Sequence, residues 1–218
     1  IQSERLTDNV LVSRMRPENA REKGMEGRRG PIVRVIDNNM LVFDPSDNID
    51  VTSPHKRRAL GVRRGKDLRF AFDRVFDETC TQMEIYHETA RLLLDGVLNG
   101  YNATVFAYGA TGAGKTYTMM GNDTGGPGVM VLTVIDLFNM MEKNKHEQSY
   151  KITISFLEVY NEQIRDLLAD PTAKPVPLEL REDKVKGMCV SGLSEHSPSD
   201  ANQVLELIRQ GTANRTQF

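Results

Sequence analysis

The sequence contains no tryptophan, and aromatic residues make up only 6% of its 218 residues. Its two cysteines, Cys80 and Cys189, lie far apart, so they do not form the dense disulfide framework of small secreted proteins. The four histidines form no ligand-spaced cluster with these cysteines, which argues against a structural zinc site. We therefore expect a protein of a reducing compartment with no structural zinc.

An excess of charge of one sign is also missing. The sequence has 28 Lys and Arg against 30 Asp and Glu, a formal net charge of −2, which argues against nucleic-acid binding through overall positive charge. No run approaches the ~20 apolar residues of a membrane span, so we expect no membrane contact. The chain begins at Ile1 without an initiator Met or an apolar signal segment, and we expect further residues before it. A content of 39% hydrophobic and 27% charged residues is typical of one large folded domain or two small ones.

Short apolar or alternating segments bounded by turn residues predict strands. They are residues 10–15, 32–36, 40–43, 67–76, 103–108, 150–156, 178–181 and 188–190. Residues 32–36 and 40–43 are close enough to form a hairpin around 37–39. Alternation with the helices predicted below indicates an α/β fold whose sheet is at least partly parallel.

Helical spacing predicts the remaining elements. Thr81 and Glu84 have the spacing of a capping box at the start of a helix over 81–98, whose inner face is expected to carry Tyr86, Ala90, Leu93 and Val97. A second helix is expected from 114, with an interruption at 125–128 and a continuation to 141. A short helix is expected over 161–168, and a last one is expected to begin at Ser199 and to end at Gly211.

One motif carries recognisable chemistry. Residues 109–116 match G-x-x-x-x-G-K-[ST] in full; they are Gly109, Ala110, Thr111, Gly112, Ala113, Gly114, Lys115 and Thr116. The glycines allow backbone N–H groups to turn around a phosphate, Lys115 can reach the β- and γ-phosphates, and the Thr116 hydroxyl can bind Mg²⁺. The motif predicts a nucleoside-triphosphate site after a buried strand; the alternative is a glycine-rich turn with an incidental lysine.

The residues themselves do not identify which side chains would bind the nucleotide base or which carboxylate would bind Mg²⁺. Tyr101 and Tyr117 flank the loop and can stack on a base, although each can equally be a core aromatic. Asp136 ends the apolar stretch 129–136, which fits a β-strand that positions a magnesium carboxylate. The same stretch fits helical spacing equally well, so the periodicity leaves both interpretations of Asp136 open.

The loop lies within a longer string, residues 100–121, that resembles the kinesin motor domain. Further matches in the order of that family are R-M-R-P at 14–17, F-D-R-V-F at 72–76, S-F-L-E-V-Y-N-E-Q-I-R-D-L-L at 155–168 and N-R at 214–215. Ala110 and Ala113, together with the stretches 43–45 and 214–217, look most like the eighth kinesin family, whose members walk toward microtubule plus ends and regulate microtubule length.

The resemblance implies a P-loop NTPase-like, three-layer α/β/α fold with a mixed central sheet that is incomplete in this chain. It implies ATP or ADP with Mg²⁺ as cofactors and Lys115 and Thr116 as catalytic residues. Arg14, Arg16, Pro17 and Tyr101 would line the adenine pocket, with Tyr117 near it. It also implies that Asp136 lies in a continuing helix and does not bind magnesium.

A basic segment gives a candidate binding surface. Residues 51–66 contain no acid and six cations, namely Lys56, Arg57, Arg58, Arg63, Arg64 and Lys66. The segment alone fits a solvated loop or a nuclear-localisation or nucleic-acid patch. In a kinesin-like motor it corresponds to a loop that can reach the acidic tubulin surface, and Arg181, Lys184 and Lys186 fall in a second such loop. With the overall charge balance, the resemblance favours microtubules and not nucleic acid as the partner.

The expected function is that of a microtubule motor that couples ATP hydrolysis to movement or to length regulation. The alternative is a module that binds nucleotide and microtubules without hydrolysis; a P-loop kinase or GTPase is disfavoured because no base-reading N-K-x-D is present. The resemblance also implies a dimer formed through a coiled coil outside this chain. The implied location is the cytoplasm and its microtubule cytoskeleton, or the spindle or nucleus.

Residues 1–218 are expected to be the N-terminal part of the motor domain. The family's first switch (S-S-R-S-H), second switch (D-L-A-G-S-E) and neck linker do not occur in the sequence. We therefore expect this chain alone to lack full ATPase activity. We also expect the strand at 103–108 to lack neighbours, with its backbone groups unpaired and no cooperative folding of the chain alone.

Overall fold

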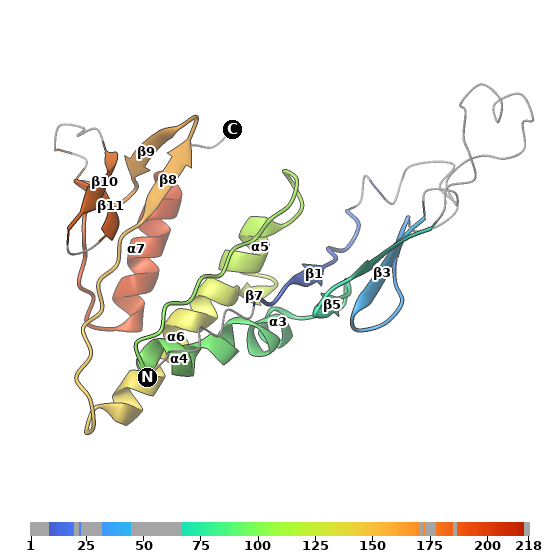
Figure 1. The fold of residues 1–218 in the computed structure, drawn as a ribbon, viewed down its shortest axis with the longest axis horizontal. Coiled ribbons are helices and arrows are strands. Elements are labelled where there is room, and N and C mark those ends of the chain that lie inside the picture. Colours follow the sequence, from blue (N-terminus) through green and yellow to red (C-terminus); the bar gives the residue numbers. More distant parts are fainter. Residues whose placement is uncertain are drawn as a thin grey trace, which may run out of the picture. The chain divides into compact units, whose positions relative to one another are not determined.

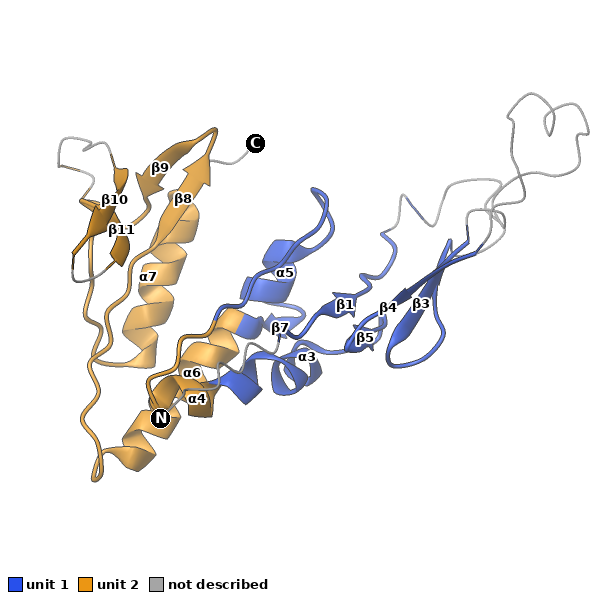
Figure 2. Cartoon of the chain, viewed as in Figure 1, with its two compact units in different colours: residues 1–93, 104–129 blue, residues 94–103, 130–218 orange. Residues whose placement is uncertain are grey.

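A computed structural model describes residues 9–19, 22, 32–44, 67–170, 172, 178–184 and 187–215. The chain divides into two compact units (Figure 2). Unit 1 contains residues 1–93 and 104–129, and unit 2 contains residues 94–103 and 130–218. Each unit has buried apolar residues of its own, such as Phe76 in unit 1 and Leu167 in unit 2.

Unit 1 carries the predicted phosphate loop and is drawn in blue in Figure 2. Its elements are β1 (Val12–Arg14), β2 (Val33–Val35), β3 (Met40–Phe43), β4 (Leu68–Ala71), β5 (Arg74–Phe76), α3 (Gln82–Glu88), η2 (Ala90–Leu93, a 3₁₀ helix), α5 (Lys115–Met120), β6 (Gly121–Asn122) and β7 (Gly126–Pro127). The segment 67–76, expected to be extended, forms β4 and β5, so that prediction is confirmed.

Two small sheets organise the first half of unit 1. Strand β1 pairs in parallel with β5, with Val12 opposite Arg74 and Arg14 opposite Phe76. The antiparallel order β2-β3-β4 confirms the predicted hairpin, whose turn is tied by the Asn39 N–H donating to Asp37 Oδ1 at 2.8 Å. The fully buried Phe76 ring anchors β5 and therefore fixes β1 beside it.

The helix predicted over 81–98 begins as expected and then breaks. Thr81 and Glu84 form the capping box in both directions, but α3 ends at Glu88, and the next residue, Thr89, has φ and ψ of −130° and −96°. The chain continues through η2 into α4 (Leu94–Leu98), which belongs to unit 2. A 3₁₀ turn holds fewer residues than an α-helical turn, so the buried face rotates. Leu94 is therefore buried. The prediction of an inner face is confirmed for Tyr86 and Ala90 and was wrong for Leu93 and Val97, which are exposed.

Unit 2 contains the rest of the helical and hairpin elements. They are α4, α6 (Val129–Asn144, entering from unit 1 at its first residue), β8 (Leu157–Tyr160), β9 (Gln163–Asp166), β10 (Glu179–Asp183), β11 (Gly187–Ser191) and α7 (Ala201–Ala213). The hairpin β10–β11 confirms the two short strands predicted there. Helix α7 runs beside the β8–β9 hairpin (Figure 1), and the Asn214 side chain donates to the Leu167 carbonyl at 2.8 Å.

The helix predicted over 161–168 was wrong. Residues 163–166 form β9, which pairs with β8 across a two-residue turn with Tyr160 opposite Gln163. Asn161 and Glu162 have φ values of 47° and 63°, the left-handed conformation that such hairpin turns need at both central positions. Two successive left-handed residues cannot start a right-handed helix, which overrides the helical spacing of the side chains after them.

Both ends of the last predicted helix differ from the expectation. Asp200 and not Ser199 caps α7, because the Asp200 side chain accepts from the Gln203 N–H at 3.0 Å. The helix also continues through Gly211, which is buried against the ring of Phe156; a Cβ there would lie 2.2 Å from Phe156 Cδ1. Glycine at this position therefore allows close packing and does not stop the helix.

Two predicted strands form no ladder among the described residues, and the burial predicted for 103–108 was wrong, because these residues are exposed or half-buried. Within the described residues, no strand pairs with 103–108, where the side chains of Phe106 and Tyr108 are 79% and 97% exposed. Residues 151–156 alternate between exposed and half-buried, yet only Ile154 forms a bridge, with His196. The observation at 103–108 agrees with the expectation that this strand lacks its neighbours. In the same described part, no helix is long and apolar enough to cross a bilayer, and His, Cys, Asp and Glu residues form no group that could hold a metal.

Candidate nucleotide-binding site

The loop 109–116 owes its shape to its glycines. Gly112 and Gly114 have φ values of 81° and 96°, a region that residues with a Cβ rarely enter. Gly114 caps α5, and the Ala113 N–H donates to the Ala110 carbonyl at 3.0 Å, which closes the turn before the helix. A Cβ on Gly109 would lie 3.1 Å from the Ala113 Cβ, so the two ends of the turn approach closely. The local sequence thus produces the compact turn that the motif predicts.

Lys115 is the charged group of this loop. Its Nζ donates to the Gly109 carbonyl at 2.7 Å and to the Ala110 carbonyl at 3.0 Å, and its side chain is partly exposed. The cation therefore folds back over the turn, beside the backbone groups predicted to surround phosphate. Thr116 follows it on the first turn of α5 and is exposed. These residues fit a triphosphate with a divalent cation, since a lysine and a hydroxyl are the partners that such a group needs.

Arg14, at the end of β1, contacts the helix that follows the loop. Its Nη1 donates to Thr118 Oγ1 at 2.9 Å, and its Cζ lies 5.0 Å from the centre of the Tyr117 ring. Partial burial lowers the pKa of Arg14 from its ordinary value, and Tyr117 acts in the opposite direction. A guanidinium nevertheless remains protonated at any relevant pH. The structure thus brings together two of the predicted adenine-pocket residues, Arg14 and Tyr117.

Gln82 is part of this cluster, although no sequence motif includes it. Its side chain, on the first residue of α3, is 3% exposed. Gln82 Oε1 accepts from Arg14 Nη1 at 2.7 Å, and Gln82 Nε2 donates to the Tyr117 carbonyl at 2.5 Å. The capping box at Thr81 fixes where α3 begins, which makes Gln82 its first residue. No sequence signal indicates that this first residue faces inward.

The other predicted adenine-pocket residues make different contacts. Arg16 forms an ion pair with Glu22 and donates to the Pro17 carbonyl at 3.1 Å. Arg16 and Pro17 are exposed. Tyr101 is 73% exposed and belongs to unit 2, whereas the loop belongs to unit 1. The structure therefore groups Arg14 with Tyr117, and places Arg16 with Glu22.

Asp136 lies within α6, so the strand interpretation of residues 129–136 is excluded. The helix that begins at Lys115 is interrupted by the β6–β7 hairpin and resumes at Val129, as expected from 125–128. The magnesium carboxylate considered for Asp136 assumed the end of a buried strand. That assumption does not hold for this chain.

Most of the predicted tubulin-facing cations lie outside the described residues; they are Lys56, Arg57, Arg58, Arg63, Arg64 and Lys186. Lys184 directly follows β10 and is exposed. Arg181 in β10 forms an exposed ion pair with Glu179 at 2.8 Å. An exposed pair of this kind is easily exchanged for another partner, because it contributes only about 0–1 kcal/mol.

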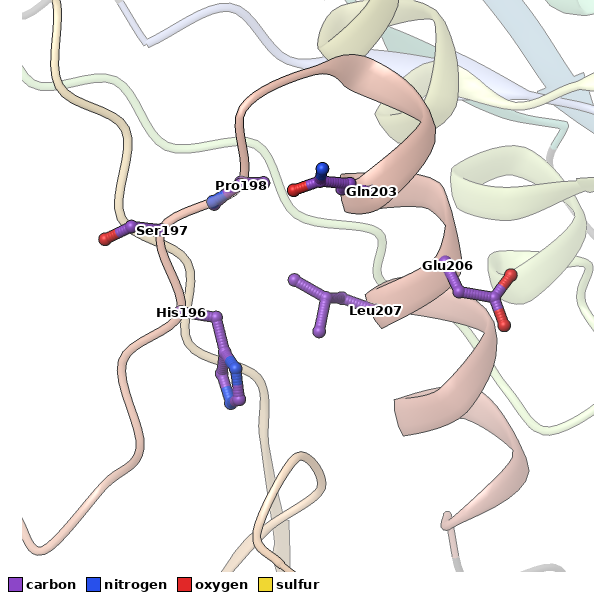
Figure 3. Close-up of a pocket in the computed structure, with 6 residues that line it drawn as sticks. All are labelled: His196, Ser197, Pro198, Gln203, Glu206 and Leu207. Atoms are coloured by element: carbon purple, nitrogen blue, oxygen red, sulfur yellow. The ribbon is translucent and has the colours of Figure 1, made fainter.

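Unit 2 contains an open hollow that is separate from the predicted site (Figure 3). It has a volume of about 320 Å³ and lies between the loop 196–198 and α7. Gln203 and Leu207 point from the helix toward that loop, whereas the Glu206 carboxylate points away from it. The hollow contains none of the predicted nucleotide-binding residues, and Glu206 forms an ion pair with Arg209 at 3.2 Å.

Comparison with known proteins places this geometry in a family. The model of the kinesin motor domain matches residues 14–218. The chain is 46% identical over 211 residues to kinesin-like protein KIF18A of Mus musculus, covering 95% of this chain and 23% of that protein. It is 48% identical over 208 residues to KIF18B of Gallus gallus, with coverage of 95% and 25%. It is 38% identical over 242 residues to KIP3 of Saccharomyces cerevisiae, with coverage of 98% and 29%.

Two solved structures share the fold at a TM-score of 0.78. One is the structure of a fast kinesin, 36% identical, of which the match covers 52% together with 94% of this chain. The other is a KIF14 dimer with AMP-PNP in complex with a microtubule, 30% identical, with coverage of 54% and 95% of this chain. The chain thus spans about a quarter of the curated relatives above and about half of these solved kinesin chains. The mixed α/β fold expected from the sequence is confirmed.

The P-loop turn, the contact of Arg14 from the R-x-R-P segment with α5, and the family match over residues 14–218 agree with one another. The similarity to KIF18A, KIF18B and KIP3 also confirms the expected likeness to the eighth kinesin family. The chain belongs to the kinesin motor domain family.

Proposed function

We propose that this chain is the ATP-binding part of a microtubule motor that couples ATP hydrolysis to movement along microtubules or to regulation of their length. The observation that carries the proposal is the position of Lys115 Nζ at the glycine turn 109–114, within a chain of the kinesin family. Lys115 binds the β- and γ-phosphates, and the loop N–H groups surround them. The Thr116 hydroxyl would hold a Mg²⁺ ion, whose charge would offset that of the phosphates.

We further propose that residues 1–218 form the N-terminal part of the motor domain, with both switches and the neck linker contributed by other residues of the parent protein. The coverage of about half of the solved kinesin chains supports this assignment. The segment 103–108, which leads directly into the loop, is exposed and pairs with no strand in the part of the chain that the structure describes, which supports the assignment as well. An apolar segment with free backbone groups gains stability when strands pair on both sides of it.

For the adenine pocket we propose Arg14, Arg16, Pro17 and Tyr101, with Tyr117 near it. The contact between Arg14 and the Tyr117 ring supports a pocket at the end of β1, since both groups offer flat faces. In full-length form we propose a dimer joined by a coiled coil outside this chain. We propose the cytoplasmic microtubule cytoskeleton, including the spindle, as its location, because the relatives are kinesins.

The ATPase rate of the complete motor domain, with and without microtubules, tests the function. We expect slow turnover that microtubules stimulate strongly. The competing hypothesis, a module that binds nucleotide and microtubules without hydrolysis, predicts no turnover in either condition. Turnover that microtubules leave unchanged would contradict the motor assignment.

The basic segment 51–66 gives a prediction about microtubule binding. Changing Arg57, Arg58, Arg63 and Arg64 to glutamine should weaken microtubule binding about tenfold or more at low salt, because these charges steer association with an acidic surface. The difference should shrink as salt rises, since exposed charges are screened over ~10 Å at 0.1 M. Microtubule co-sedimentation over a salt series measures both effects, while ADP affinity should stay unchanged.

A matched control removes the same net charge elsewhere. Lys143, Lys145, Lys151 and Arg209 are exposed, and their change to glutamine should affect co-sedimentation much less. Equal weakening by both sets would attribute the effect to net charge alone. An unaltered low-salt binding curve for the 51–66 variant would show that this segment does not contribute to microtubule binding.

A further inference from the structure

We propose that Gln82 is a positioning residue for the nucleotide site, acting through Arg14 and helix α5; the inference rests on the proposed nucleotide-binding function. Gln82 touches neither the loop 109–114 nor Lys115 through any contact described above. Its two hydrogen bonds instead join β1 to the helix that carries Lys115 and Thr116. We call Arg14, Gln82, Tyr117 and Thr118 the Gln82 network.

The Gln82 network has one consistent arrangement of donors and acceptors. A guanidinium only donates and a backbone carbonyl only accepts. The Gln82 amide must therefore direct its oxygen to Arg14 Nη1, at 2.7 Å, and its NH₂ group to the Tyr117 carbonyl, at 2.5 Å. Neither an aspartate-like nor a lysine-like side chain can do both, so the position requires an amide of this length.

Arg14 completes the network through its own contacts with α5. The two N–H protons of its Nη1 serve Gln82 Oε1 and Thr118 Oγ1, and its Cζ lies 5.0 Å from the Tyr117 ring centre. Helix α5 is thus held at its backbone by Gln82 and at two successive side chains by Arg14. Because α5 has only six residues, it has little stability of its own, and these contacts decide where it lies.

The network acts on the site through one turn of helix. Tyr117 and Thr118 lie within a turn of Lys115 and Thr116, and the Thr118 N–H donates to the Gly114 carbonyl at 2.9 Å. A shift of α5 therefore moves the lysine amine and the threonine hydroxyl relative to the loop. Binding groups must be held within about 0.5 Å of their productive geometry, and burial of Gln82 gives its hydrogen bonds the rigidity for this task.

Labelled-ADP titrations of the complete motor domain test the inference with three variants. Gln82→Leu keeps the approximate volume but removes both hydrogen bonds, and should raise the Kd for ADP about tenfold, the loss typical of outer-shell partners. Thr118→Val removes only the Arg14 contact and should raise the Kd severalfold. Asp200→Ala is the matched control, because it removes the side-chain cap of α7, a helix that carries no residue of the Gln82 network. It should lower the thermal midpoint and leave the Kd unchanged.

The outcomes distinguish a role of Gln82 in positioning the nucleotide site from a role only in stabilising the fold. A Kd for Gln82→Leu within twofold of wild type, with a lowered thermal midpoint like that of Asp200→Ala, overturns the inference and leaves nucleotide binding intact. If Gln82→Leu does not fold, Thr118→Val decides: a raised Kd supports the inference and an unchanged one overturns it. A wild-type motor domain that binds no ADP overturns the proposed function itself, and this inference with it.

Discussion

Replacing Lys115 by alanine will lower the affinity of the complete motor domain for ADP by at least a hundredfold. A cation 4 Å from one phosphate charge contributes a gross attraction of about 4 kcal/mol at an effective dielectric constant of 20. Desolvation of the amine offsets part of this attraction, and each 1.4 kcal/mol that remains is about a factor of ten in Kd. The lysine also bonds to the Gly109 and Ala110 carbonyls, so its removal loosens the loop as well.

A labelled-ADP titration measures this loss, and two further variants identify its cause. Lys143→Ala removes the same charge from an exposed position on α6, so an unchanged Kd there excludes a general charge effect. Lys115→Met keeps a long side chain but removes its charge. Its Kd for ADP should resemble that of Lys115→Ala, because the attraction is electrostatic. Wild-type affinity for Lys115→Ala would refute the assignment of the loop as a phosphate site.

The features that sequence predicts well are those whose cause is local. The glycines of 109–116 determine a turn wherever they occur, and Thr81 with Glu84 caps a helix through bonds between residues three apart. The interruption of the helix after Lys115 was predictable for the same reason, since 125–128 contain Gly-Gly-Pro-Gly. For these features the chain itself supplies both partners within a few residues.

Features that depend on distant partners were missed or incomplete. The hydrogen bond between Arg14 and Gln82 joins residues that are 68 positions apart, and no residue near Gln82 in the sequence indicates it. The apolar run 103–108 has the composition of a buried strand, but a strand also needs neighbours, and none pairs with it among the described residues. At Asn161 and Glu162 the left-handed backbone determined a hairpin, while the side-chain spacing indicated a helix. The same sequence can satisfy two periodicities, and only the backbone conformation decides between them.

The second large expected effect is a loss of stability on substitution of Gly121, where α5 meets the β6–β7 hairpin. This residue has a φ of 82°, and a Cβ there would lie 2.1 Å from the Gly126 carbonyl oxygen and 2.5 Å from the Gly128 nitrogen. Left-handed backbone costs a residue with a Cβ about 1–2 kcal/mol. The collision with backbone atoms adds roughly 1–3 kcal/mol, since overpacked sites relax only by shifting the chain. Gly121→Ala should therefore lower the free energy of unfolding of the complete motor domain by about 3 kcal/mol.

Gly126 is the matched control for Gly121, because its φ is 81° but nothing lies within 4 Å of the position of its missing Cβ. Gly126→Ala should cost only the backbone part, about 1 kcal/mol. Thermal unfolding in the presence of ADP should thus show a midpoint lowered at least twice as far by Gly121→Ala. The excess measures how tightly the β6–β7 hairpin packs against the end of α5, where the Gly121 N–H donates to the same Tyr117 carbonyl that Gln82 uses. Equal midpoints for both variants would show that this close packing adds nothing to the stability of the motor domain. Conformational strain at the two glycine positions would then explain both losses.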